Sequence, residues 1–372
     1  MTEPAQRVLD GSAWADFCEA LKGAGDVIER PRSPRTPLDR AEGYRYLSRL
    51  ARLALEKFVE HSDPLAPRFY QLSHETAKIG ADNPDSFYQN AAISGAHEYR
   101  IRGTRGTVSY LSLSTYYGDY GKSARSGCSG ALEGDEIRVD PDGSFEVWLS
   151  CQRRPGNWLP LEPDSSMLIV RQNFLDRERE EPARLSIERI DAAGPPAPLS
   201  PDFLAEALDS AGRYVGATAG LFADWAEGFH EHPNELRELD PAMTVGAHGS
   251  PHFRFFMGYW ELAPDEALLL ETTPPRCAYW NFQLNTHWME SLDYRYHRIH
   301  VNQHSCRTER DGSFRLVVAH QDPGLPNWIE TAGHAAGTMA LRWVKADHHP
   351  KPATRVVKLA ELRAGRGGGG AA

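Results

Sequence analysis

The chain has 372 residues, of which 41% are hydrophobic, 10% aromatic and 25% charged, a composition that supports a buried core and argues against wholesale disorder. Its 41 basic and 51 acidic residues give a net charge of −10, which argues against nucleic-acid binding or an anionic-membrane surface, because phosphate binding needs a concentrated positive patch. The length is too great for one ordinary core and predicts about two structural units.

The sequence also bears on the compartment. No apolar run reaches the roughly 18 residues of a membrane span, and the stretch MTEPAQRVLDGSAWADF lacks the basic and apolar regions of a signal peptide. Five widely spaced cysteines predict neither a disulfide framework nor a structural zinc site. We therefore expect a cytoplasmic protein.

The first part of the chain has the spacing of amphipathic helices. Apolar residues such as Phe17 and Leu21 recur at helical spacing over residues 10–80, and three prolines divide this stretch. The segment Asp82-Asn83-Pro84-Asp85 predicts a turn. We expect an N-terminal helical region over residues 1–90.

Strand and turn patterns then replace the helical spacing. Residues 91–190 contain short alternating segments such as SFEVWL, joined by turns. Residues 191–247 begin as a proline- and alanine-rich linker and continue at helical spacing over 202–240, and strands resume over 248–362. The glycine-rich end at 363–372 predicts a disordered tail.

The two strand-rich regions resemble each other. At an offset of 169 residues, Tyr110 aligns with Tyr279 and the turn DGSF recurs, and Asn157-Trp158 is echoed by Asn327-Trp328. One supersecondary unit used twice explains this order better than convergent hairpin sequences. The fold class predicted is α+β and strand-rich, with two β-sandwich-like lobes from an internal duplication, an N-terminal helical region and a helical insertion between the lobes.

Several longer strings carry a family resemblance. They are DNPDSFY, EYRIRGTRG, GNWLPL, ALLLETTPP, YWNFQLNTHWMESLD, DPGLPNWIETAGH and GTMALRW. Together they resemble the bacterial family known as domain of unknown function 1214, over residues from about Tyr44 to Leu362. The resemblance implies β-sandwich lobes with helical additions, and it brings no activity and no catalytic residues.

One strand has an unusual polar face. In RCAYWNFQLNTHW, one face carries Tyr279, Asn281, Gln283, Asn285 and His287, with no charged side chain apart from the imidazole. Such a face suits a pocket wall that hydrogen-bonds a ligand, although a solvated face or amides paired across strands would look the same. The repeat-related strand offers the uncharged residues Tyr110, Ser112, Ser114 and Tyr116.

Two arginines lie in apolar strands, where a guanidinium group must be paired or hydrogen-bonded. Arg171 has the acidic run at 176–181 as a candidate partner, whereas the sequence offers none for Arg342. Either arginine can belong to an internal ion pair or anchor an anionic ligand group. The predicted ligand-binding residues are Tyr110, Ser112, Tyr116, Asn281, Gln283, Asn285 and Arg342.

Histidines are candidates for acid–base chemistry. A single histidine acting with a carboxylate fits the spacing better than a metal cluster, and the predicted catalytic residues are His287, His320 and Tyr279. No metal or other cofactor is predicted, and His300 with His304 on one face of a strand is the alternative metal pair. No nucleotide-binding loop or GxSxG motif occurs, and HGSPH at 248–252 is interpreted as a loop.

Three functions stay open. The first is a metal-independent acid–base enzyme, a lyase, isomerase or hydrolase, acting on a hydrophobic molecule with hydroxyl or carbonyl groups, such as a lipid, steroid or terpenoid. The second is a non-catalytic protein that binds such a molecule. The third is a structural or assembly protein. The expected partner is a small hydrophobic molecule, and two similar lobes also permit a homodimer.

Overall fold

A computed structural model describes residues 2–120, 125–190, 194 and 196–364 of the chain. Residues 365–372 of the predicted tail, and residues 191–193 and 195 of the predicted linker, lie outside this range.

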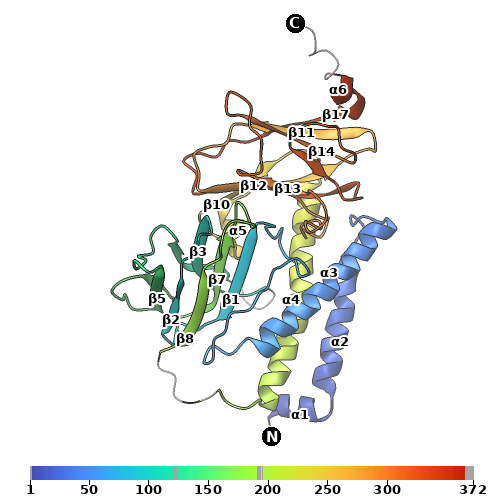
Figure 1. Cartoon of the computed structure of the whole chain (residues 1–372). Coiled ribbons are helices and arrows are strands. Elements are labelled where there is room, and N and C mark those ends of the chain that lie inside the picture. The colour runs from blue at the N-terminus through green and yellow to red at the C-terminus, as the bar shows by residue number, and fades with distance from the viewer. Residues whose placement is uncertain (1, 121–124, 191–193, 195, 365–372) are drawn as a thin grey trace.

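Helices from the start of the chain pack beside a long helix from its middle (Figure 1). Thr2 and Thr36 accept a backbone hydrogen bond at the start of two of them, and a proline occupies the first turn of each. The N-terminal elements are α1 (Glu3–Leu9), α2 (Ser12–Ala24), the 3₁₀ turn η1 (Gly25–Val27), α3 (Pro37–Leu55) and the π-helical turn η2 (Glu56–Glu60).

The helical prediction for residues 10–80 is wrong beyond Glu60. Residues 61–80 form turns, with an isolated bridge between Tyr70 and Asn90. Pro64 and Pro67 explain the difference, because proline cannot donate the backbone hydrogen bond that a helix interior requires.

The predicted helical insertion is α4 (Pro201–Phe229), whose first turn is capped by Ser200. Its buried face packs against α2 and α3, where Phe17, Tyr46 and Tyr214 share one apolar cluster. The helix ends about ten residues earlier than predicted, and β9 (Arg237–Glu238) and α5 (Pro241–Gly246) follow.

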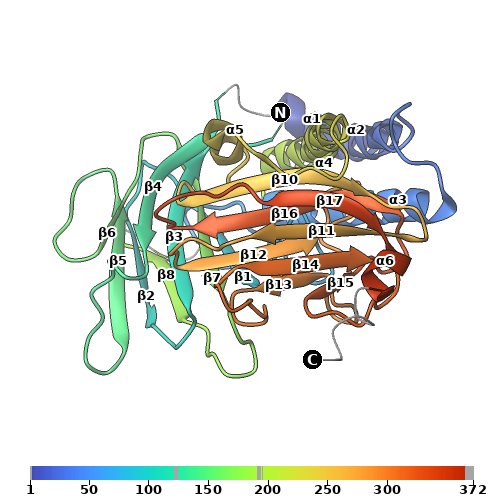
Figure 2. The same ribbon diagram turned by 90° about the horizontal axis from the view of Figure 1, so that it is seen from above.

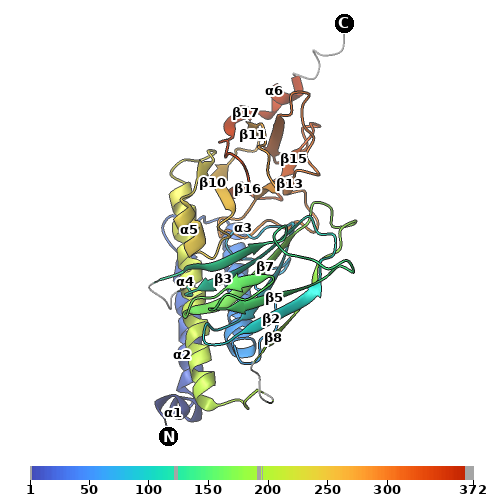
Figure 3. The same cartoon turned by 90° about the vertical axis from the view of Figure 1, so that its left-hand side faces the viewer.

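Two four-stranded sheets form the first lobe, with strand orders β1-β7-β3-β4 and β6-β5-β2-β8. Leu113, Val147 and Val170 belong to the apolar core between them, and Figure 3 shows the two sheets as layers beside α4. The strands are β1 (Ser86–Ala92), β2 (Tyr99–Thr104), β3 (Tyr110–Tyr117), β4 (Gly127–Glu133), β5 (Ser144–Ser150), β6 (Trp158–Pro160), β7 (Ser165–Asn173) and β8 (Arg184–Arg189).

The second lobe repeats this arrangement. Its sheets have the orders β13-β12-β16-β10-β9 and β15-β14-β11-β17, so that β10 to β17 occupy the positions of β1 to β8 apart from the added edge strand β9. The duplication predicted from sequence is thus confirmed. The strands are β10 (Phe253–Glu261), β11 (Glu266–Thr272), β12 (Tyr279–Leu284), β13 (His300–Asn302), β14 (Phe314–Ala319), β15 (Trp328–Glu330), β16 (Ala336–Val344) and β17 (Ala353–Lys358), followed by α6 (Leu359–Ala364).

The asparagine of the repeated Asn-Trp pair forms the same backbone hydrogen bonds in both lobes. The Asn157 amide donates to the backbone carbonyls of Arg138 and Glu146, and the Asn327 amide donates to those of Arg307 and Arg315. Each amide oxygen also accepts a backbone N–H at 2.8 Å, from Arg138 and Arg307 respectively. These bonds fix the same loop against the same strand twice.

The second lobe lies above the first, and helices α1 to α4 lie beside the first lobe and below the second (Figure 1), as the view from above also shows (Figure 2). The lobes have separate apolar cores, and smaller clusters join them to each other and to α4. Within the described residues, every helix is too short or too polar to cross a lipid bilayer.

Candidate functional site

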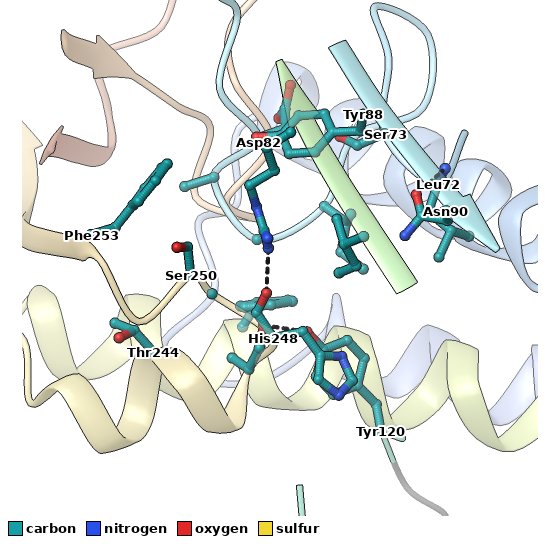
Figure 4. Close-up of a pocket in the computed structure, with 18 of the residues that line it drawn as sticks. Leu72, Ser73, Asp82, Tyr88, Asn90, Tyr120, Thr244, His248, Ser250 and Phe253 are labelled. Atoms are coloured by element: carbon teal, nitrogen blue, oxygen red, sulfur yellow. Dashed lines mark hydrogen bonds between the residues drawn. The ribbon is translucent and has the colours of Figure 1, made fainter. Parts of the chain in front are cut away.

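A cavity of about 150 Å³ lies where the two lobes meet α4. Its walls come from β1, β7, β10, β16, α4 and the segments at 72–82 and 244–250. Figure 4 shows His248, Tyr120 and Thr244 on one side, with Tyr88, Leu72 and Asn90 on the other. Most of the lining surface is apolar, as expected for a small-molecule site.

Two repeat-related arginines line this cavity, Arg171 on β7 and Arg342 on β16. Both are buried. Arg171 donates to the Tyr116 hydroxyl at 2.9 Å and to the His248 carbonyl at 2.5 Å, the bond that reaches the carbonyl oxygen in Figure 4. Within the described residues, no carboxylate of the predicted partner run at 176–181 forms an ion pair with Arg171, and Glu180 accepts hydrogen bonds from Ser109.

Arg342 makes the corresponding contacts from the second lobe. One of its nitrogens donates to the amide oxygens of Asn281 at 3.1 Å and Gln283 at 2.6 Å, and the other donates to the Ala81 carbonyl. Burial lowers the pKa of Arg342, but a guanidinium group stays protonated at any physiological pH.

The two arginines exchange contacts between the lobes. Arg171 of the first lobe bonds the carbonyl of His248, which precedes the second lobe, and Arg342 of the second lobe bonds that of Ala81, which precedes the first. Ala81 and His248 both have left-handed backbones, with φ of 56° and 59°, a conformation that non-glycine residues rarely adopt. Ala81 and His248 thus occupy equivalent positions in the two lobes, and the carbonyl of each accepts a hydrogen bond from the arginine of the other lobe.

The positive charge of Arg171 has no carboxylate partner among the described residues. Neither Arg171 nor Arg342 forms an ion pair with a described residue, whereas the Lys57 ammonium lies 2.8 Å from Asp119. The Asp82 carboxylate accepts hydrogen bonds from Ser291 and, with Asp85, acts electrostatically on Arg342. After the desolvation caused by burial, the largest electrostatic effects on the pKa of Arg171 come from the hydroxyl groups of Tyr116 and Tyr88.

The predicted pocket wall on β12 lies elsewhere. Tyr279, Asn281, Gln283 and Asn285 are all fully buried, yet none of them lines the cavity. Tyr279, Asn281 and Gln283 face the turn at 82–85 and form hydrogen bonds with it, whereas the Asn285 amide donates to the Thr338 hydroxyl. Asn281 donates to Asn83 at 2.8 Å, and Gln283 to the Asp82 carbonyl at 2.8 Å.

Asp85 lies at the centre of this buried network. Its two carboxylate oxygens accept from the Tyr279 hydroxyl at 2.6 Å and face His300 Nε2 at 3.0 Å. Burial opposes the charge of Asp85, but His300 and Tyr279 together hold its pKa below the usual value. The network joins the first lobe to the second.

The polar residues of β3 are also buried outside the cavity. The Tyr116 hydroxyl donates to the Gly249 carbonyl and accepts from Arg171. The hydroxyl groups of Tyr110, Ser112 and Ser114 have no hydrogen-bond partner within the described structure. Of the ten residues predicted for catalysis and ligand binding, Arg342 alone lines the cavity.

The predicted catalytic histidines lie apart from each other and from the cavity. His320 is held between the Thr331 hydroxyl at 2.8 Å and the Leu262 carbonyl at 3.2 Å. His287 Nδ1 lies 3.1 Å from the Tyr259 hydroxyl, and burial lowers the pKa of His287 to about 4. His287 is therefore neutral at pH 7.

Burial of His287 predicts a loss of stability in acid. An unfolded histidine has a pKa of ~6.5, so as the pH falls the unfolded chain binds a proton before the folded chain does. The stability that neutral His287 contributes is therefore present above that pH and is lost as the pH falls toward about 4. We expect His287→Leu to reduce the slope of unfolding free energy against pH by up to about 1.4 kcal/mol per unit in this window. Urea unfolding across pH measures it, and an unchanged slope would contradict the assignment.

The alternative metal pair is separated in the structure. His300 faces Asp85, whereas His304 lies 3.6 Å from Asp176. Within the described residues, no three His, Cys, Asp or Glu side chains gather in an arrangement that could hold a metal ion.

Sequence reasoning missed most of the cavity. Lys57, Tyr120, Tyr214, His248 and Ser250 all line it, and they come from four distant parts of the chain. The HGSPH segment, interpreted as a loop, supplies His248 and Ser250. His248 Nε2 lies 2.9 Å from the Ser126 hydroxyl, and burial lowers the pKa of His248 to about 4.

Known proteins resemble this chain in sequence and in fold. The family described as "Protein of unknown function (DUF1214)" matches residues 85–172 and 267–348, one stretch in each lobe. The crystal structure of an uncharacterized protein from Burkholderia cenocepacia shares 49% identity with a TM-score of 0.94, and the match covers 96% of this chain and 99% of that one.

A more distant structure shares the fold alone. The VPA0106 protein from Vibrio parahaemolyticus has 12% identity and a TM-score of 0.51, over 85% of this chain and 98% of that one. No curated protein matches. The two family matches and the near full-length likeness to the Burkholderia protein establish that the chain belongs to the DUF1214 family of proteins of unknown function.

Proposed function

We propose that the cavity between the lobes binds a small organic anion with an apolar body. The observation that carries this proposal is the presence of two buried guanidinium groups in one cavity, neither of them paired with a carboxylate of the described chain. A buried charge without a counter-charge is costly. A carboxylate on a ligand would supply the missing charge and accept the N–H donors of arginine.

Arg171 is the better anchor of the two. Arg342 is held by two amide oxygens and a carbonyl and experiences the negative charge of Asp82 and Asp85. Arg171 has only uncharged acceptors, the Tyr116 hydroxyl and the His248 carbonyl. An anionic group would therefore gain most at Arg171.

The size and lining of the cavity limit the enclosed part of the ligand. Its volume, about 150 Å³, is below the roughly 300–1,000 Å³ of common ligand pockets and matches that of an apolar cavity known to hold one benzene ring. The aromatic side chains of Tyr120, Tyr214 and Phe222 are among the residues that line it. One carboxylate with a single ring or a short branched chain fits this space.

Turnover is a second candidate, favoured by one contact. The His248 imidazole at the cavity wall lies 2.9 Å from the Ser126 hydroxyl, within the range at which a histidine can remove a hydroxyl proton. The low pKa of His248, caused by burial, keeps the imidazole neutral at pH 7 and makes it a weak base. Acid–base chemistry on a bound carbonyl compound would use His248, the member of this pair that lines the cavity.

Charge-matched probes test the proposal. We expect benzoate to raise the thermal midpoint of the protein in a dose-dependent way and to bind about tenfold or more tightly than benzamide, because a charge-assisted hydrogen bond contributes ~1.5–3 kcal/mol. Calorimetric titration at pH 7 measures both affinities. Equal affinities, or no binding of any compact aromatic or branched carboxylate, would refute the proposal. Product in the titrated sample, detected by NMR, would favour turnover.

A further inference from the structure

A second, larger hollow adjoins the cavity. It has a volume of about 570 Å³, is mostly apolar, and shares two wall residues with the inner cavity, Lys57 and Met167. Its other walls include Phe58, Tyr70 and Ile93. We call it the outer groove. The shared wall makes the two spaces neighbours.

Strand β7 runs from the anion anchor to this shared wall. Met167, Ile169 and Arg171 alternate along β7 and all line the inner cavity, while Leu168 and Val170 point into the core of the first lobe. Because a strand advances ~3.3 Å per residue, the four steps from Arg171 to Met167 span about 13 Å. The inner cavity thus has a charged end and an apolar end.

Lys57 lies on the wall that the inner cavity and the outer groove share. Its ammonium lies 2.8 Å from Asp119 and 5.1 Å from the ring centres of Phe58 and Tyr214. The charge of Lys57 is therefore already matched, and its methylene stem offers apolar surface, as lysine stems commonly do.

We infer that the ligand is an elongated amphipathic acid that lies along β7, with its anionic group at Arg171 and its apolar chain passing Ile169 and Met167 into the outer groove. This inference rests on the proposed function and adds the shape of the ligand to it. A compact acid would fill the inner cavity alone, whereas an elongated one also buries its chain in the outer groove.

A series of straight-chain carboxylates from butanoate to dodecanoate tests the inference. We expect affinity to rise about threefold to fourfold with each added methylene once the chain passes Met167, since burying one contributes ~0.8 kcal/mol. Titration calorimetry below the micelle concentration measures the series. Affinity that stops rising within the inner cavity would overturn the inference while leaving the proposed function standing. Failure of butanoate and benzoate alike would remove the proposed function itself.

Two variants locate the chain in the outer groove. Met167→Trp should abolish the gain from longer chains, because Met167 lies on the wall that the two spaces share. Ser166→Trp should also abolish this gain while leaving butanoate affinity within about twofold, because Ser166 is exposed and lines only the outer groove. Ser186→Trp, at an exposed position on β8, is the matched control and should keep the full chain-length dependence. Unaltered dependence in both groove variants would overturn the inference.

Discussion

Replacing Arg171 by methionine should weaken the binding of a carboxylate ligand by about 30-fold to several thousand-fold, the equivalent of ~2–5 kcal/mol for truncating one member of a buried, hydrogen-bonded charge pair. The methionine keeps most of the side-chain volume and removes a buried guanidinium group that donates to uncharged acceptors and pairs with no carboxylate of the described residues. Calorimetric titration of wild type and variant with the same carboxylate gives the two dissociation constants.

Stability should respond much less than binding. Arg171→Met relieves the cost of a buried charge but leaves the His248 carbonyl without its donor, and these effects oppose each other, so the free energy of unfolding should stay within about 2 kcal/mol of wild type. Arg177→Met is the matched control, because Arg177 also donates to backbone carbonyls but lies outside the cavity. Equal losses of affinity in the two variants would contradict the assignment of Arg171.

Asp85→Ala should reduce the free energy of unfolding by about 3–5 kcal/mol, the usual cost of removing one partner from a buried charged network. His300 would lose its carboxylate partner, and the Tyr279 hydroxyl would keep only the longer contact to Asn83 at 3.2 Å. The two lobes would also lose a buried contact that joins them. Urea unfolding at pH 7 measures the change.

An exposed aspartate provides the control for Asp85. Asp265 pairs with Lys358 at the surface, so Asp265→Ala should cost no more than about 1 kcal/mol. Because the folded pKa of Asp85 is lowered, its contribution is present above about pH 4 and is lost as pH falls through the folded value, which lies lower still. A change below about 1 kcal/mol for Asp85→Ala would show that the network is not stabilising.

The fold was predictable where its signals are local. The Asp-Gly turns and the Asn-Trp pairs form hydrogen bonds with backbone groups of neighbouring strands. The recurrence of the Asn-Trp pair at 157–158 and 327–328 therefore identified the duplicated unit correctly. The stretch at 61–80 has apolar residues at helical spacing, but Pro64 and Pro67 prevent a helix there. Helix breakers decide such segments when no cap or apolar partner supports a helix.

The candidate site was harder to predict because its walls meet only in the tertiary structure. Alternation along β12 correctly separated its two faces, since Trp280 and Phe282 enter the core while Tyr279 and Asn281 face outward. The alternation of polar and apolar residues does not show what packs against the polar face of a strand. In this structure the turn at 82–85 packs against that face of β12, in place of a ligand. The useful signal was the recurrence of an arginine at 171 and 342 inside apolar strands, where a charge must meet an acceptor.

The exchange of contacts by Arg171 and Arg342 has a consequence for symmetry. Residue i meeting j while j meets i is the pattern of a two-fold dimer of identical chains, in which both halves must be alike. Joining the halves in one polypeptide removes that obligation, so Asp82 can stand near one arginine while the matching position beside the other is Gly249. Fusion of the two halves therefore permits a ligand in the central cavity to bind in one orientation only. A dimer of identical subunits would bind the same ligand equally well in either orientation.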